Sequence, residues 1–175
     1  ISSAGISRGS LKYLADTGRL DQVSRGVYTL PEVWEDEFVS IQERYKRGVF
    51  ALDTALFLHD LTDRTPHKFH MAFPYGYNTS SPKAAGILCS CKKEPYYSLG
   101  IALVDTPAGN TVRAYNAEKT LCEILKPISH TDIQIITDAF KRYAGRKDKN
   151  IPLLSEYAHQ LRVEKRLRPY LEVLL

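Results

Sequence analysis

Residues 5–30 read GISRGSLKYLADTGRLDQVSRGVYTL, and this stretch decides how the rest of the chain is interpreted. The apolar side chains of Leu11, Leu14 and Ala15 are three and four residues apart, which predicts a helix over residues 7–17 with one packing face. A serine stands at its start and a glycine follows its end, as expected of residues that cap a helix. One face of this helix would pack, and the other would be open to a partner.

Two short strands are expected directly after this helix. They cover residues 20–24 and 27–30 and are joined by Arg25-Gly26, a tight turn with an Arg at its tip. A short helix followed by a hairpin suits duplex DNA, because the helix fits the major groove and the hairpin can lie along a phosphate strand. The alternative interpretation is a helical segment that only packs in a domain core.

Six side chains of this stretch are the predicted DNA contacts. They are Arg8, Ser10, Lys12, Tyr13, Arg19 and Arg25. Those of the helix would reach base edges or flanking phosphates, with Arg8 as the candidate for bidentate contact to guanine. Those of the hairpin would hold phosphates, which sets the register on the duplex without choosing its sequence.

The net charge of +4 is divided unevenly along the chain. Residues 1–30 carry four Lys or Arg against two Asp, and residues 141–175 carry nine against four Glu or Asp. The segment between them, residues 31–140, holds eleven Lys or Arg against fourteen Asp or Glu. Two basic ends therefore flank an acidic middle, which is the distribution expected of a protein that contacts a polyanion in two regions.

The basic C-terminal segment supplies a second set of candidate contacts, for a polyanion or a protein partner. They are Lys141, Arg142, Arg146, Lys147, Lys149, Arg162, Lys165 and Arg166. An alternative function follows from them, namely a protein- or RNA-interaction module that binds no specific DNA sequence. A third interpretation is that these side chains only solvate the faces of the last helices, as runs of charge commonly do.

The sequence as a whole predicts an α+β fold with two domains, residues 1–33 and residues 34–175. The first is expected to be a winged helix-turn-helix, and the second a small, mostly antiparallel sheet packed with helices. Helices are predicted over residues 35–47, 54–61, 116–126, 131–143, 152–161 and 163–174, and strands over residues 68–74, 87–91, 96–105 and 111–115.

Four local features refine this prediction. Asp53 is expected to cap the second of these helices and Asn116 the third. Residues 76–82 (GYNTSSP) read as a polar, mobile loop. Pro169 is expected to kink or split the last helix, because proline lacks the amide proton that a helix interior uses.

The blocks GISRGSLKYLADTGRLDQVSRGVYTL, ALFLHDLT, HMAFPYGYN and VRAYNAEKTLCEILK occur in this order and spacing over nearly the whole chain. In this combination the sequence resembles the AbiEi family, the antitoxins of abortive-infection AbiE type IV toxin–antitoxin systems. The wing pattern G-x-L-x-x-V-x-R-G-V-Y and the segment Y-N-A-E-K-T-L-C-E carry most of the resemblance. Each block alone would be weak evidence.

The resemblance implies a repressor that binds promoter DNA, at repeats upstream of its own operon, through its winged helix-turn-helix. It also implies a C-terminal domain needed for antitoxicity and a nucleotidyltransferase toxin as functional partner, with direct binding to that toxin left open. The sequence departs from this pattern at its start. Only Ile1 to Ala4 precede the turn at Gly5, so we expect the helix that would brace the recognition helix to be missing from this sequence.

The three cysteines favour reduced thiols over a disulfide framework. Cys89-x-Cys91 with His67 and His70 is a poor match to structural zinc sites, whose thiols are usually separated by two or more residues. Cys122 lies in an apolar segment and is expected to be a small core residue. No metal site and no cofactor are therefore predicted.

Enzyme motifs are missing from this sequence, and no catalytic residue is predicted. His59 is expected to be a hydrogen-bonded structural residue. Glu118 and Lys119 do not match the acid-x-Lys spacing of metal-dependent nucleases, so Glu118 is expected to pair locally or with a donor in the core. Without an apolar run long enough to span a bilayer or a signal-peptide pattern, a cytoplasmic protein is expected.

Overall fold

The computed structural model describes residues 21–24, 27–29 and 36–174. Its contacts divide the chain into two compact units, residues 1–46 and residues 47–175, each of which is described by itself. The predicted domain boundary between residues 33 and 34 lies outside the described residues. It stays a prediction.

In the first unit, the two predicted strands are present as an antiparallel pair. They are β1 (Asp21–Ser24) and β2 (Val27–Thr29), with Gln22 opposite Tyr28. The register shifts between Gln22 and Ser24. The predicted recognition helix over residues 7–17 and the tip of the hairpin lie outside the described residues.

Helix α2 (Glu37–Arg44) is shorter than the predicted helix over residues 35–47. Asp36 is its N-cap, and the carboxylate accepts a hydrogen bond from the amide of Phe38 at 3.0 Å. An Asp at this position satisfies an amide that has no partner within the helix, which fixes where the helix begins.

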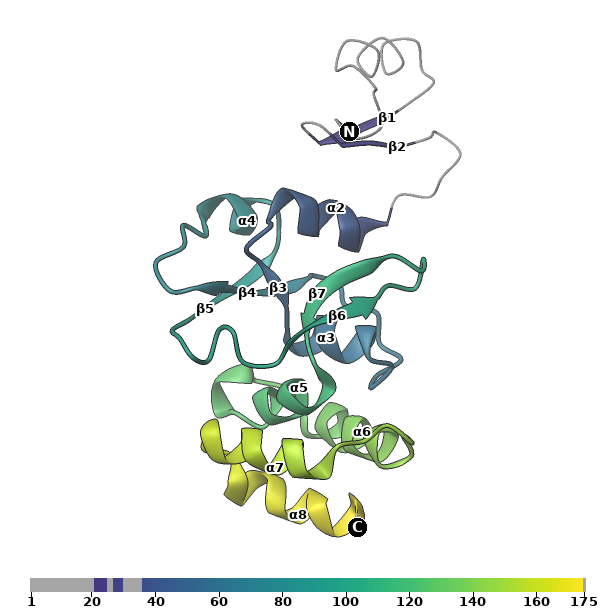
Figure 1. Ribbon diagram of the computed structural model, residues 1–175, viewed down its shortest axis with the longest axis vertical. Coiled ribbons are helices and arrows are strands. Elements are labelled where there is room, and N and C mark those ends of the chain that lie inside the picture. Colours follow the sequence, from purple (N-terminus) through teal and green to yellow (C-terminus); the bar gives the residue numbers. More distant parts are fainter. Residues whose placement is uncertain (1–20, 25–26, 30–35, 175) are drawn as a thin grey trace. The chain divides into compact units, whose positions relative to one another are not determined.

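The second unit is built on a five-stranded sheet with the order β5-β4-β3-β7-β6 (Figure 1). Its strands are β3 (Val49–Phe50), β4 (His70–Pro74), β5 (Leu88–Lys92), β6 (Ile101–Asp105) and β7 (Thr111–Tyr115). β3 pairs antiparallel with β4 and parallel with β7, while β4 and β5 are parallel and β6 and β7 antiparallel. The α+β class is confirmed, but the prediction of a mostly antiparallel sheet is wrong because the sheet is mixed.

Two short elements that were not predicted account for the mixed sheet. β3 has only two residues, both fully buried, so its sequence has no alternating pattern, yet it joins the two halves of the sheet. α4 (Ser80–Ala84) connects β4 to β5, and such a crossover allows the two strands to run parallel. Part of the segment predicted as a polar, mobile loop, residues 76–82, is therefore helical.

Helix α3 (Leu52–Leu58) starts earlier than predicted, and Asp53 is not its cap. The N-cap is Ala51, and Asp53 lies in the first turn. The hydroxyl of Thr54 instead accepts a hydrogen bond from the amide of His70 at 2.8 Å, which ties the helix to β4. The first turn of α3 thus takes its position from the sheet and not from a side-chain cap.

The strand predicted over residues 96–105 is also shorter than expected. β6 begins at Ile101, and Gly100 ahead of it has a φ of +69°. A Cβ at this position would lie 3.0 Å from Asn116 Oδ1 and 3.0 Å from Lys119 Cβ. Both the backbone conformation and the close approach of α5 therefore require glycine here.

The helical predictions for the C-terminal half are confirmed to within a few residues. The helices are α5 (Ala117–Ile124), α6 (Ile133–Ala144), α7 (Ile151–Gln160) and α8 (Glu164–Leu174), with the 3₁₀ turn η2 (Pro127–Ser129) after α5. Asn116 caps α5 as predicted, because its side chain accepts from the amide of Lys119 at 3.0 Å. α8 continues through Pro169 and is not split.

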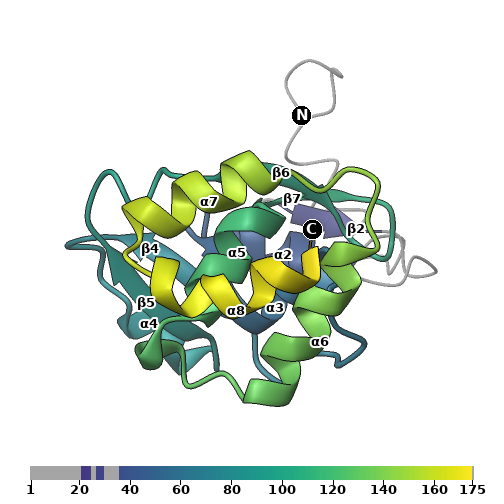
Figure 2. The same cartoon turned by 90° about the horizontal axis from the view of Figure 1, so that it is seen from below.

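Helix α5 lies between the sheet and the other C-terminal helices. It packs against α3, α6 and α7, and α8 packs on α6 and α7 (Figures 1 and 2). Every one of its eight residues is buried, including Glu118, Lys119 and Glu123. Cys122 is fully buried, which confirms its predicted place in the core. α5 is therefore the central helix of this unit.

Each charged side chain of α5 has partners in the surrounding structure. Tyr143 of α6 donates a hydrogen bond to Glu118 at 2.7 Å, which confirms the expected core donor. Lys92 of β5 forms an ion pair of 2.5 Å with Glu123. A buried charge is tolerated only when paired in this way.

Lys119 is the most deeply buried charge, with no exposed side-chain surface. Its ammonium group donates hydrogen bonds to the carbonyl of Tyr96 and to that of Leu99 at 2.7 Å, and it lies 3.5 Å from the ring centroid of Tyr115. Glu123 is 3.9 Å away. Burial lowers the pKa of the Lys119 ammonium to about 7, although Glu123 opposes this change.

We expect Lys119→Met to lower the free energy of unfolding by about 3 kcal/mol, because it leaves two carbonyls without a donor and removes one of the cations near Glu123. Urea denaturation of the whole chain measures this loss. The matched control is Lys93→Met, since Lys93 is an exposed lysine whose removal should cost less than about 1 kcal/mol. Equal stability of the two variants would contradict a structural role for the Lys119 contacts.

Candidate functional site

The six predicted DNA-contacting residues lie outside the residues that the structure describes. They are Arg8, Ser10, Lys12, Tyr13, Arg19 and Arg25. The flanking strands β1 and β2 are described, and they hold residues 24 and 27 opposite each other on the two sides of the turn. The roles of the six side chains stay predictions.

The eight predicted C-terminal contacts are all described. Lys141 and Arg142 lie in the last turns of α6. The connection to α7 carries Arg146, Lys147 and Lys149. Arg162 precedes α8, which contains Lys165 and Arg166. Two segments, residues 141–149 and residues 162–166, therefore carry these cations in the helical part of the unit, whose helices are seen in Figure 2.

Some of these cations are used in contacts within the chain. Arg142 forms an ion pair of 3.2 Å with Asp63. The Arg166 guanidinium donates to the carbonyl of Leu125 at 3.0 Å, and the Lys149 ammonium donates to the carbonyl of Ala144 at 2.7 Å. Lys141, Lys147, Arg162 and Lys165 are exposed and form no ion pair with any residue that the structure describes. These four are the ones left for an external partner.

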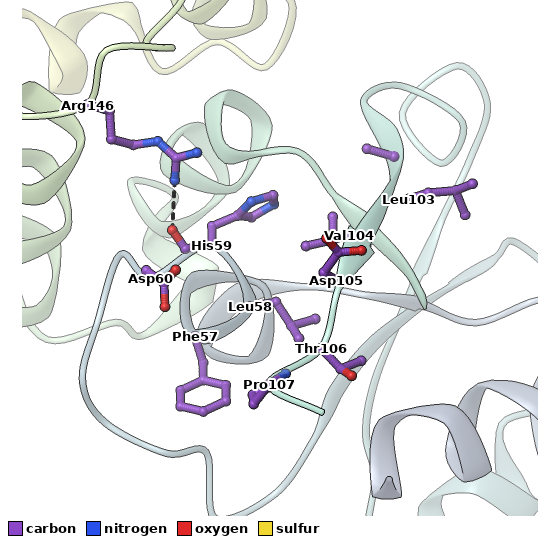
Figure 3. A pocket seen from close by; sticks show the side chains of 11 residues that line it. Phe57, Leu58, His59, Asp60, Leu103, Val104, Asp105, Thr106, Pro107 and Arg146 are labelled. Carbon is purple, nitrogen blue, oxygen red and sulfur yellow. Dashed lines mark hydrogen bonds between the residues drawn. The ribbon is translucent and has the colours of Figure 1, made fainter. Parts of the chain in front are cut away.

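The structure adds a pocket that the sequence did not predict, and Arg146 contributes to it (Figure 3). We name this pocket, of about 490 Å³, the β6 groove. It is lined by the end of α3 and the residues that follow, by β6 and the turn after it, and by Arg146: Phe57, Leu58, His59, Asp60, Ala102, Leu103, Val104, Asp105, Thr106, Pro107 and Arg146.

Each of the three guanidinium nitrogens of Arg146 donates a hydrogen bond to an acceptor of the chain itself. Its Nε and one terminal nitrogen donate to the two carboxylate oxygens of Asp148, at 2.9 and 2.7 Å. The other terminal nitrogen donates to the carbonyl of His59 at 2.7 Å, the bond drawn in Figure 3. The hydrogen bond from Arg146 lowers the pKa of the Asp148 carboxyl to about 2. Arg146 thus joins the α6–α7 connection to the end of α3.

His59 is hydrogen-bonded within the unit, as expected of a structural residue. Its Nε2 lies 2.7 Å from the carbonyl oxygen of Tyr115. A carbonyl only accepts, so Nε2 carries the proton and donates. Burial lowers the pKa of the His59 imidazole from its ordinary value. This histidine links the end of α3 to the end of β7.

The groove carries an excess of negative charge. Asp60 and Asp105 line it, and neither forms an ion pair with a residue in the described ranges. The single cation of the lining, Arg146, is paired with Asp148. With two unpaired carboxylates, the groove lining is negatively charged, whereas the helices beside it are basic.

The cysteine and histidine side chains considered as zinc ligands do not form a metal site in the described part of the chain. Nowhere in the described part of the chain do three or more His, Cys, Asp or Glu side chains gather as a metal site would require. His70 Nδ1 lies 3.8 Å from Asp53, and burial lowers the pKa of this imidazole. Burial raises the pKa of the Cys89 thiol, which disfavours the thiolate that binds a metal.

Residues 1–31 match the family model described as a transcriptional regulator, AbiEi antitoxin. The AbiEi resemblance is thus supported over these first 31 residues. The match covers the residues predicted to form the recognition helix and the wing.

A search of curated proteins gives no match for this AbiEi-like chain. Among solved structures it is similar to the crystal structure of the RV2827C protein from Mycobacterium tuberculosis, with 15% sequence identity and a TM-score of 0.58. The similarity covers 90% of this chain, which spans 62% of that one. At this identity the likeness concerns the fold. Across the described ranges, every helix is too short or too polar to cross a bilayer.

We expect the free energy of unfolding to fall as the pH is lowered from about 7 to about 5. Because burial lowers the pKa of His59 and of His70 below the ordinary value of 6.5, the unfolded chain binds protons more readily than the folded one in this range. His59→Gln should make the fall shallower, since a glutamine can still donate to the Tyr115 carbonyl but does not titrate. Urea denaturation at several pH values measures the slope.

The matched control is His67→Gln, because His67 is exposed. It should leave the pH dependence of the unfolding free energy unchanged. A slope in His59→Gln as steep as in the unmodified chain would contradict the structural role given to His59.

Proposed function

We propose that this chain is an AbiEi antitoxin that represses its own operon by binding double-stranded promoter DNA through residues 1–33. The single observation that carries the proposal is the family match over residues 1–31, which includes all six predicted DNA-contacting residues. The antiparallel pair β1–β2 supports it, since a wing is a hairpin of this kind. The excess of Lys and Arg over Asp in residues 1–30 adds attraction to phosphates.

In this proposal the contacts divide into two kinds. Arg8, Lys12 and their neighbours on the helix would read base edges in the major groove, where an arginine can donate two hydrogen bonds to guanine. Arg25 at the hairpin tip would hold a phosphate, and this contact depends on salt but not on sequence. Specificity and general affinity therefore belong to different residues.

The proposal assigns the larger unit to antitoxicity without catalysis. Its partner in function would be a nucleotidyltransferase toxin encoded beside it, acting in the same cytoplasm during phage defence. The deep burial of the reactive groups of α5 is in keeping with a binding protein, because Lys119 and Glu123 are held by internal partners and have no access to a substrate.

A second candidate function rests on the exposed cations of the helical part. Lys141, Lys147, Arg162 and Lys165 could dock the larger unit on RNA or on an acidic protein, without sequence-specific recognition of DNA. In that case residues 1–30 would be dispensable for antitoxicity. The two functions are compatible, since they use different parts of the chain.

We expect this protein to bind its own upstream DNA more tightly than a scrambled duplex, in gel-shift titrations at about 50 mM and about 200 mM salt. Arg8→Ala and Lys12→Ala should each lose about 1 to 3 kcal/mol of binding free energy on the operator, and less on scrambled DNA. Arg25→Ala should weaken binding to both duplexes by a similar factor and reduce the dependence on salt.

Lys93→Ala is the matched control for the loss of one exposed cation elsewhere in the chain, and it should leave the titrations unchanged. Equal losses on operator and scrambled DNA for the two helix variants would refute the division of roles. Equal affinity of the unmodified chain for both duplexes would refute the proposed repressor.

A further inference from the structure

We propose that the β6 groove binds an extended segment of a protein partner, which adds to the sheet as a strand beside β6 and carries an apolar residue with a Lys or Arg two positions away, on the same face of the strand. This binding site is separate from the proposed DNA contacts, and its argument does not depend on them. Four features of the groove support it: the outer edge of β6, which pairs with no further strand among the described residues, the volume beside that edge, the exposed Leu103 and the unpaired carboxylates.

The first feature is the edge of the sheet. β6 is the last strand in the sheet order, and on its inner side it pairs with β7. The carbonyl of Gly100 accepts from the amide of Asn116 at 2.8 Å, and the amide of Thr106 donates to the carbonyl of Asn110 at 2.7 Å. In an antiparallel pair, residues that form main-chain hydrogen bonds with the partner strand alternate with residues whose amide and carbonyl groups face away from it. The amide and carbonyl groups of Leu103 and Asp105 therefore face away from β7.

The second feature is the space beside this edge. The groove has a volume of about 490 Å³, and its other side is formed by the end of α3 and by Arg146 (Figure 3). Pockets of about 300 to 1,000 Å³ are typical of ligand sites in proteins. An added strand would lie about 4.8 Å from β6, which is the usual spacing within a sheet. A short extended peptide thus fits where a compact domain would not.

The third feature is an uncovered apolar side chain. Leu103 is 74% exposed, although it lies in the middle of β6. The residue opposite it on a neighbouring strand would cover it, because cross-strand side chains contact each other on the face of a sheet. β7 covers only one side of Leu103, through its partner Arg113. An apolar residue of an added strand would cover the other.

The fourth feature, the charge of the groove, selects among partners. Asp60 and Asp105 form no ion pair with other described residues, whereas all three nitrogens of Arg146 are used on Asp148 and His59. A phosphate or a nucleic acid would therefore meet two unpaired carboxylates and one cation whose charge is already paired with Asp148. A segment with Lys or Arg would pair with those carboxylates. The charges thus favour a basic peptide over a polyanion.

The proposal is tested with the full chain and a fluorescent peptide of about six residues that has valine and lysine in turn at every second position and threonine between them, so that valine and lysine share one face of the strand. We expect fluorescence anisotropy to show saturable binding that weakens with salt. The same peptide with glutamate in place of lysine should bind at least about tenfold more weakly, because it is repelled by the two carboxylates. A fully N-methylated valine–lysine peptide should also lose binding, because it cannot donate main-chain hydrogen bonds to β6.

Two variants connect the binding to the groove. Asp60→Asn combined with Asp105→Asn should weaken the valine–lysine peptide about tenfold and reduce its salt dependence. The matched control is Asp132→Asn with Asp138→Asn on α6, which removes the same charge away from the groove and should leave the affinity unchanged. Thermal denaturation of each variant shows that the fold is retained.

Several outcomes would overturn the proposal. These are no binding of the valine–lysine peptide, equal binding of the glutamate or N-methylated peptide, and equal effects of the two double variants. Displacement of the bound peptide by single-stranded DNA would assign the groove to nucleic acid instead. A dimer in sedimentation that Leu103→Ser dissociates would assign the edge of β6 to a second copy of this chain.

Discussion

The complete burial of α5 is the constraint on which the larger unit depends. A helix with eight buried residues that include Glu118, Lys119 and Glu123 is stable only if each charge finds a partner. The partners come from three directions: Tyr143 from α6, Lys92 from β5, and the carbonyls of Tyr96 and Leu99 from the turn ahead of β6. The same helix therefore fixes the sheet, that turn and the helical layer relative to one another.

The groove beside β6 follows from this arrangement. The turn held by Lys119 leads directly into β6, so the helix that organises the core also sets the position of the sheet edge. The opposite wall is fixed by two bonds, from His59 to the carbonyl of Tyr115 and from Arg146 to the carbonyl of His59. A strand edge beside a fixed wall can accept one further strand. The acidic residues that line the groove determine the charge that this added strand must carry.

The sequence predicted the elements whose signals are local. Asn116 marked the start of α5, and helical periodicity located the C-terminal helices. The tight turn at residues 25–26 indicated the strands β1 and β2, and a run of branched and aromatic residues indicated β7. It failed where position depends on distant contacts. β3 is too short to show a pattern. Asp53 was expected to cap α3, but the first turn of this helix is positioned by the hydrogen bond between Thr54 and β4. The β6 groove was missed because its walls come from three separate segments, α3, β6 and the α6–α7 connection.

Native-state hydrogen exchange of the α5 amides measures most directly whether this helix holds the larger unit together. If it does, the amides of Leu121 to Ile124 will exchange only by global unfolding, with an opening free energy equal to that obtained from urea denaturation. They would then be among the slowest amides of the chain. Exchange of these amides at a clearly lower opening free energy than those of β4 or α6 would contradict the central role given to α5 and its buried charges.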